Sequence, residues 1–296
     1  PPPLRPDRLD TAPPKGVPVG WRRPRRAPSG GFGDRKPALI KIALLGPVEV
    51  RRSGQVVRGF ESRKALALLG YLALTGQPQR REHLADLLWP DLPSVRARGN
   101  LSRVLHNLTH LLPDVWSADR WTIGLPPGPR CWLDAERFRA LAALPRPEAW
   151  LEAASLVRGE LMADLEVDAC PELERWLAAE RRAWHERVTE LLDRLVQHHR
   201  ALGRRDDALA WAHRLVRRDP WHEQGQRTLM ALLAESGQRA AALAQFEQCR
   251  LALADELDVE PDDETVALYE RIRRGELAAH DAPRADAPGN LPLPLT

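Results

Sequence analysis

The chain has 296 residues, 43% of them hydrophobic and 29% charged, with a formal net charge of +3. This length allows about two domains whose cores need neither disulfide nor metal. Cys131, Cys170 and Cys249 stand far apart and match no disulfide or zinc spacing, which suits a reducing cytosol. No apolar run reaches the roughly 18 residues of a membrane span, and the first residues lack a signal-peptide core. We therefore expect a cytoplasmic protein outside the membrane.

The charge is unevenly distributed. Residues 1–37 hold nine Lys/Arg and three Asp/Glu, residues 38–139 hold fifteen and nine, and the remainder holds twenty and twenty-nine. A GC-rich genome could supply the arginines, but it would not place the positive surplus on one side. A cationic amino-terminal half attracts a polyanion.

Residues 1–37 contain ten prolines and the run Arg22-Arg23-Pro24-Arg25-Arg26, with almost nothing to bury. This composition predicts a disordered tail. The tail is either passive or a basic arm that adds unspecific phosphate contacts.

Residues 38–139 predict a winged helix-turn-helix domain, in which strands are followed by three helices and a terminal hairpin. Ser62 and Gly76 are typical of the ends of the first helix, because a serine caps a helix start and a glycine its end. The elements expected are strands at 39–46, 48–50 and 55–57, helices at 62–76, 80–88 and 94–112, and a hairpin of 121–123 with 131–133.

The helix at 94–112 carries the functional argument. Its leucines and Val104 fall at i, i+3, i+4, i+7, i+10 and i+11, which makes one buried stripe. The opposite side of this helix has no carboxylate, whereas an ordinary exposed helix mixes acids with bases. Arg, Asn, Ser and His are groups that bond base edges and phosphates. The side chains that we assign to a DNA-reading face are Arg96, Arg98, Asn100, Ser102, Arg103, His106 and Asn107.

Beyond Asp134 the composition changes to helices rich in Ala, Leu, Arg and Glu. Gly203–Leu209 and Gly237–Leu243 align at an offset of 34 residues, which is the period of tetratricopeptide helical hairpins. We predict an all-α tetratricopeptide-like domain over 140–276, with helices at about 148–162, 172–199 and 263–274 as further layers. A generic helical bundle is the alternative. Residues 277–296 predict a Pro-rich linker.

Several motifs occur together in one order along residues 39–275. They are Ser62-Arg63-Lys64, Leu88-Trp89-Pro90-Asp91, Arg96-Ala97-Arg98-Gly99-Asn100-Leu101, Trp132-Leu133-Asp134 with Phe138, Arg158-Gly159-Glu160-Leu161, Glu174-Arg175-Trp176-Leu177 and Leu257-Asp258-Val259-Glu260-Pro261. In these the chain resembles the Streptomyces antibiotic regulatory protein (SARP) family. Its members are transcription activators that join an OmpR-type winged helix to a bacterial transcriptional activator domain.

The resemblance implies promoter binding at direct repeats as a homodimer, recruitment of RNA polymerase holoenzyme and a nucleoid-associated location. It places Arg63 and Lys64 on phosphates, and Arg96, Arg98, Asn100, Arg103 and Asn107 in the groove. Arg120 and Arg130 of the hairpin would follow the DNA backbone. His106, Asn107 and His110 stand where the family usually has further arginines, so the base preference can differ. The ending Asn290–Thr296 resembles the lead-in to a nucleotide-binding STAND-type domain of larger members.

The sequence does not predict an enzyme or a cofactor. It has no Gly-x-Ser-x-Gly, no His-Glu-x-x-His and no Cys-x-x-Cys, and the nine histidines are scattered. No phosphate-binding Gly-x-x-x-x-Gly-Lys-Ser/Thr occurs, so we expect no ATP binding in this piece. The alternative function is a protein-interaction scaffold in which the winged helix mediates assembly, and such a helix would expose apolar or mixed-charge residues.

Overall fold

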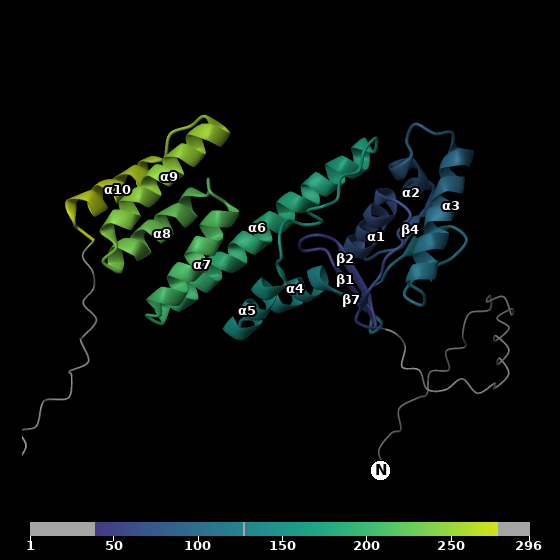
Figure 1. The fold of residues 1–296 in the computed structure, drawn as a ribbon, viewed down its shortest axis with the longest axis horizontal. Helices are drawn as coiled ribbons and strands as arrows, with labels where there is room; N and C mark the ends of the chain where they lie inside the picture. The colour runs from purple at the N-terminus through teal and green to yellow at the C-terminus, as the bar shows by residue number, and fades with distance from the viewer. Residues whose placement is uncertain (1–38, 127, 278–296) are drawn as a thin grey trace, which may run out of the picture. The chain divides into compact units, whose positions relative to one another are not determined.

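The computed structural model describes residues 39–126 and 128–277, and Figure 1 shows how their helices and strands follow one another. A first sheet has the strand order β3-β2-β1-β7, formed by β1 (Ile40–Ala43), β2 (Glu49–Arg52), β3 (Gln55–Val56) and β7 (Cys131–Leu133). β1, β2 and β3 pair in the antiparallel manner that the sequence predicts. β7 instead runs parallel to β1.

Three helices follow the meander and match the prediction: α1 (Arg63–Thr75), α2 (Arg81–Leu88) and α3 (Ser94–Leu111). The Ser62 hydroxyl accepts the Ala65 N–H at the start of α1, and Gly76 ends that helix with a φ of 63°. Both residues provide the capping that their types favour. The apolar stripe of α3 lies buried on the other two helices, with Leu101, Val104 and Leu108 all at most 2% exposed.

The predicted hairpin between 121–123 and 131–133 is wrong. β6 (Thr122–Gly124) pairs with β5 (Ser117–Ala118) and β4 (Gln79–Arg80) in a second sheet, whereas β7 pairs with β1 in the first. The Asp119 carboxylate accepts the N–H groups of Trp121 and Thr122 at 2.7 and 2.6 Å, which closes a tight turn before β6. The prolines of the connection after β6 have no N–H to donate to a hairpin ladder.

These strands and helices form a winged helix-turn-helix, in which α2 and α3 are the helical pair and β5 and β6 are the wing. Figure 1 shows α1, α2 and α3 grouped beside the first sheet. No helix within 39–126 and 128–277 has both the length and the apolar character needed to cross a membrane.

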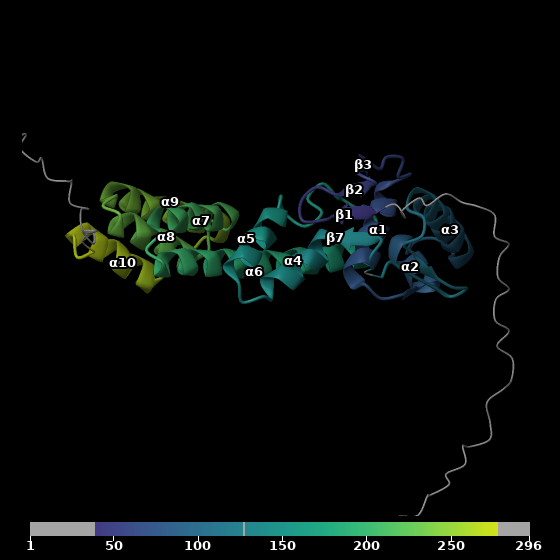
Figure 2. The same ribbon diagram turned by 90° about the horizontal axis from the view of Figure 1, so that it is seen from below.

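The chain passes from β7 directly into α4 (Asp134–Ala142), then α5 (Pro147–Leu156) and the long α6 (Pro171–Ala201). The helix that we expect to 162 ends at 156, because the following residues bind the end of β1. The Met162 N–H donates to the Leu44 carbonyl at 2.8 Å, and the Arg158 N–H to the Leu45 carbonyl at 2.7 Å. Figure 2 shows the same ribbon from below, with α4 alongside α6.

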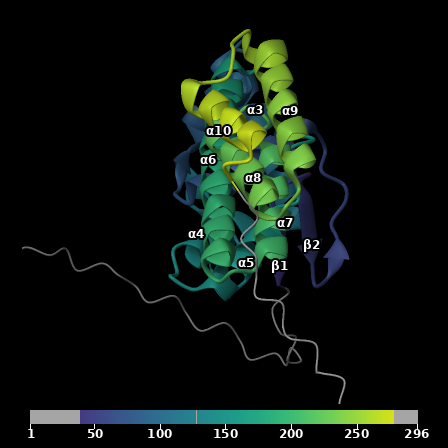
Figure 3. The ribbon, with the colours of Figure 1, turned by 90° about the vertical axis from the view of Figure 1, so that its left-hand side faces the viewer.

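The described residues end with four helices, α7 (Arg205–Arg218), α8 (Glu223–Glu235), α9 (Arg239–Leu257) and α10 (Asp263–Arg274). Gly203 and Gly237, which are 34 residues apart, precede α7 and α9 with φ values of 69° and 76°. Ala208 and Ala242, at the same offset, are both fully buried. Figure 3 shows α8, α9 and α10 packed together, as expected of tetratricopeptide-like hairpins.

Two apolar cores hold these elements. One cluster of buried side chains runs without a break from β1 through the winged helix to Leu195 of α6 and Leu215 of α7. The second joins α7 to α10 and includes Leu229 and Phe246. The winged helix therefore shares its core with α4, α5 and α6, across the boundary at 139/140 that the sequence predicts.

Candidate nucleic-acid interface

The outer face of α3 is open to solvent. Arg96, Arg98, Ser102, Arg103 and His106 are exposed. Asn100 and Asn107 lie half-buried at its edges, and His110 is exposed one turn beyond His106. The guanidinium and amide groups thus stand on the side opposite the buried leucines, where α3 can present them to a groove of DNA.

Carboxylates from other elements reach two of the arginines, although α3 itself has none. The Arg98 Nη1 lies 3.6 Å from Glu82 Oε1 of α2, and the Arg103 Nε lies 3.4 Å from Glu61 Oε1 of the loop before α1. No such ion pair involves Arg96 within the described part of the chain. Helical periodicity describes only the residues of one helix, so the sequence did not reveal these carboxylates.

Asn107 holds a loop of its own protein. Its Nδ2 donates to the Gly59 carbonyl at 3.1 Å, and its Oδ1 accepts the Glu61 N–H at 3.3 Å. Both ends of the amide are therefore occupied, whereas reading an adenine edge would need both of them free. In this structure Asn107 therefore binds the loop at Gly59 and Glu61, and its amide is not free for the predicted base contact.

Lys64 faces the protein, whereas the Arg63 side chain is exposed and pairs with a carboxylate at the surface. The Lys64 Nζ donates to the Leu88 carbonyl at the end of α2 at 2.6 Å, and lies 5.5 Å from the ring centre of Trp89. The Arg63 Nη1 lies 3.2 Å from Glu166 Oε2. The predicted phosphate contact of Lys64 does not fit this geometry, because its ammonium satisfies a carbonyl that the helix end leaves unpaired.

The wing carries Arg120 in the turn between β5 and β6, but it does not carry Arg130. The Arg120 guanidinium carbon lies 4.8 Å from the ring centre of Trp121, whose side chain is 65% exposed. Arg130 belongs to the connection before β7, and its carbonyl accepts the Ile40 N–H. Its placement in the wing followed from the wrong hairpin, and that part of the prediction is corrected.

A groove of about 680 Å³ runs between the wing and the start of the helical pair. Its lining contains four arginines and two acids, together with Trp121 and Thr122. The charged residues are Arg80, Arg81, Glu82, Arg98, Asp119 and Arg120. The four arginines outnumber the two acids, so the groove carries a formal surplus of two positive charges. Hydrogen bonds from the N–H groups of Thr122 and Trp121 hold the pKa of Asp119 below its usual range.

Arg80, Arg81 and Trp121 line this groove together with Arg98 of α3, and the sequence pattern did not indicate them. The pairing of Arg80 with Thr122 joins strands of two and three residues that lie far apart in the chain, and such short strands carry almost no pattern. Val95 was also missed, because we assigned only polar residues to the face. It is 74% exposed in the first turn of α3, and an apolar side chain there can contact a thymine methyl.

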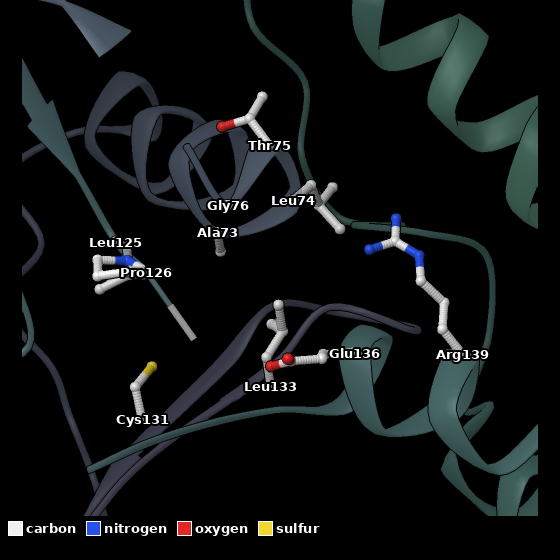
Figure 4. Close-up of a pocket in the computed structure, with 10 residues that line it drawn as sticks. All are labelled: Ala73, Leu74, Thr75, Gly76, Leu125, Pro126, Cys131, Leu133, Glu136 and Arg139. Carbon is white, nitrogen blue, oxygen red and sulfur yellow. The ribbon is translucent and has the colours of Figure 1, made fainter. Parts of the chain in front are cut away.

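A separate cavity of about 130 Å³ lies between the end of α1, the chain after β6 and α4. Figure 4 shows Cys131 and Glu136 at this cavity, with Arg139 on its far side. Burial raises the pKa of the Cys131 thiol to about 11 and lowers the pKa of Arg139. Ligand pockets usually measure about 300–1,000 Å³, so this cavity suits water better than a cofactor. Within 39–126 and 128–277, no three His, Cys, Asp or Glu side chains gather to hold a metal.

Comparison with known proteins identifies the helices that follow the winged helix. Residues 133–273 match the family model of the bacterial transcriptional activator domain. We call these residues the activator domain. The chain is also 27% identical over 266 residues to the transcriptional regulatory protein MoaR1 of Mycobacterium bovis (strain BCG / Pasteur 1173P2) and to MoaR1 of Mycobacterium tuberculosis (strain ATCC 25618 / H37Rv), covering 83% of this chain and 83% of each relative. Both findings support a transcription regulator of SARP-like type.

The fold is also similar to a solved structure, that of Mycobacterium tuberculosis EmbR in complex with a low affinity phosphopeptide. The TM-score is 0.61 at 24% identity, and the match covers 80% of this chain. This chain spans 65% of that EmbR chain. The likeness supports the fold, a winged helix followed by an all-α activator domain.

Proposed function

We propose that the chain is a sequence-specific DNA-binding transcription activator. The exposed face of α3 carries this proposal, because it presents arginine and asparagine without any acid of its own beside a groove lined by arginines. In a winged helix the second helix of the pair enters the major groove. Arg96, Arg103 and Asn100 are the side chains that we assign to base edges, and Arg120 of the wing to the backbone.

The activator domain supports the second half of the proposal. A protein that contains such a domain and resembles MoaR1 is expected to act on transcription. We therefore propose that it binds direct repeats at promoters as a homodimer, acts at the nucleoid and recruits RNA polymerase through helices of the activator domain. A nucleotide-binding domain following Thr296 in a longer protein remains part of this proposal.

Selection of genomic fragments bound by this chain tests the proposal first. A specific protein would enrich a repeated motif, and the spacing of its half-sites would report the dimer geometry. Fluorescence anisotropy with the selected duplex and a scrambled duplex of equal length would then give the two affinities. Enrichment of no motif, together with equal binding of both duplexes, would contradict sequence-specific recognition.

Variants then test the residues. Arg103→Ala should remove about 1–3 kcal/mol of discrimination between the selected and scrambled duplexes, because a base contact is lost. Arg120→Ala should weaken both duplexes alike and reduce the salt slope by about one. Arg250→Ala is the matched control, because Arg250 is a half-exposed arginine of α9 that pairs with Glu247, far along the chain from α3. If Arg250→Ala changed discrimination as much as Arg103→Ala, α3 would not be the reading element.

A further inference from the structure

Two carboxylates stand beside the DNA-reading face without belonging to α3. Glu61 comes from the loop before α1 and Glu82 from α2, and each lies next to one arginine of the face, Arg103 or Arg98. The arginine side chains are 71% and 52% exposed, so the pairs stand on the surface that DNA would cover. Carboxylates at such a surface repel phosphate, and their presence on a DNA-binding face calls for an explanation.

The Glu61 arrangement is built into the fold. Gly59, with a φ of 93°, allows the loop to turn towards α3, since few side chains tolerate that backbone angle. The Asn107 amide then binds the Gly59 carbonyl and the Glu61 N–H. Asn107 follows Arg103 by one helical turn, so the same helix face holds both the clamp and the paired arginine. The Glu61 side chain is only 26% exposed in this position.

Magnitudes show what such a pair does. An exposed ion pair changes an equilibrium constant by up to about fivefold. A good bidentate contact between arginine and guanine changes it by about five- to 150-fold. A base contact therefore outweighs the ion pair, whereas a single phosphate contact on random DNA only about balances it. When the arginine leaves its carboxylate for a phosphate, the carboxylate stays beside the phosphates and repels them. This repulsion lowers the affinity for every sequence that offers no base contact.

We propose that Glu61 and Glu82 are specificity-determining residues that hold Arg103 and Arg98 away from phosphates until a matching base edge displaces them. This inference rests on the proposed DNA-binding function. It assigns Asn107 a positioning role, because that amide keeps Glu61 beside Arg103. Arg96, which no carboxylate accompanies within the described residues, supplies phosphate or base contacts on any duplex.

Glu61→Gln and Glu82→Gln test the proposal in the whole chain, with the selected and scrambled duplexes described above. Each variant should bind the scrambled duplex about three- to fivefold more tightly, because an arginine is freed for phosphate. One more phosphate contact steepens the log–log salt slope by about 0.9, which is about a threefold greater loss of affinity between 50 and 200 mM salt. Affinity for the selected duplex should rise less, so the specificity ratio falls.

Asp86→Asn is the matched control. Asp86 is exposed on α2 and pairs with no arginine of α3 in the described part of the chain. The substitution therefore removes the same charge as the two test variants without releasing an arginine. The control should keep the wild-type salt slope. Thermal unfolding of each variant checks that the fold is retained, and glutamine keeps the size and shape of the glutamate that it replaces.

Asn107→Ala separates positioning from direct contact by the sign of its effect. Release of the clamp should raise affinity for the scrambled duplex, as Glu61→Gln does, whereas loss of a base contact would lower affinity for the selected duplex alone. If the wild type prefers its selected duplex but Glu61→Gln keeps the wild-type ratio and slope, this inference is wrong and the proposed function stands. If the wild type binds neither duplex, both are wrong.

Discussion

Two helical glycines should respond in opposite ways to the same substitution. Gly70 lies in the middle of α1 and Gly99 in the first half of α3. A Cβ at Gly99 meets nothing within 4 Å, whereas a Cβ at Gly70 would lie 2.7 Å from the Met162 sulfur and closer still to its methyl carbon. Glycine in a helix interior costs about 0.5–1 kcal/mol relative to alanine. Gly99→Ala should therefore stabilise the protein by about that amount.

Gly70→Ala gains the same helix propensity but forces Met162 to move. Ordinary carbon contacts lie at about 3.5–4.0 Å, so the Met162 side chain must retreat by roughly 1 Å. Met162 is fully buried and its N–H is bonded to the Leu44 carbonyl, so the surrounding core must absorb the shift. Overpacking of this kind costs about 1–3 kcal/mol. The net result should be a loss of about 1–2 kcal/mol.

Thermal or urea unfolding followed by circular dichroism measures both effects. At roughly 2–4 °C per kcal/mol, Gly70→Ala should lower Tm by about 2–8 °C and Gly99→Ala should raise it by about 1–4 °C. In a Met162→Ala background the clash is absent, so Gly70→Ala should become stabilising. If Gly70→Ala raised Tm in the wild-type background as Gly99→Ala does, the close approach of the activator domain to α1 would be refuted.

Three further outcomes follow from the contacts and pKa values. Lys64→Met should lower the free energy of unfolding by about 1 kcal/mol and leave the salt slope of DNA binding unchanged, because the Lys64 ammonium binds the Leu88 carbonyl. A flatter salt slope would show that Lys64 contacts a phosphate instead. Burial raises the pKa of Cys131 and Cys249 to about 11, so both thiols should react with a disulfide reagent far more slowly in the native than in the unfolded protein. Burial lowers the pKa of His199 below 6.5, so the unfolded chain takes up a proton at a higher pH than the folded chain does. Stability should therefore fall as the pH drops below about 6.5. In urea titrations His199→Gln should weaken this fall, and an equal fall in the variant would contradict the role of His199.

The helices of the winged helix were predictable because their signals are local. Ser62 and Gly76 mark the ends of α1 through their own backbone and hydroxyl chemistry, and the leucine stripe of α3 needs only helical spacing. The wing was not predictable in this way. Its pairing depends on two-residue strands and on the Asp119 turn, and the sequence instead offered a plausible hairpin partner in 131–133. β7 joined β1 because Cys131 and Leu133 bury their side chains there.

The exposed side of α3 was likewise predictable, but its electrostatics were not. Periodicity places Arg96 and Arg103 outward, and the structure shows both exposed. Which groups stand opposite them depends on loops that cross from elsewhere, as Glu61 does. Asn107 is an example, because an asparagine on an exposed helix face can bind either a base edge or the backbone of a neighbouring loop. The sequence of the helix alone does not say whether such a loop lies beside it.

The position of α3 depends on the activator domain as well as on its own three-helix group. β7 leads into α4 with no linker, since Leu133 pairs with Ile42 in the sheet and Asp134 begins the helix. The buried Asp134 carboxylate accepts the Leu44 and Leu45 N–H groups at 2.8 Å. Each buried donor left unpaired would cost about 1–3 kcal/mol.

A second contact acts at the other end of the shared core. The Cys170 Sγ donates to the Leu88 carbonyl at 3.1 Å, where α2 ends and the turn to α3 begins. Tyr71 of α1 packs edge-on against Trp176 of α6 with ring centres 4.7 Å apart. A hinge between the winged helix and α6 would have to break these contacts and the sheet pairing together. Movement of α6 should therefore carry α3 with it, because these contacts join α6 to α1 and α2, on which α3 packs.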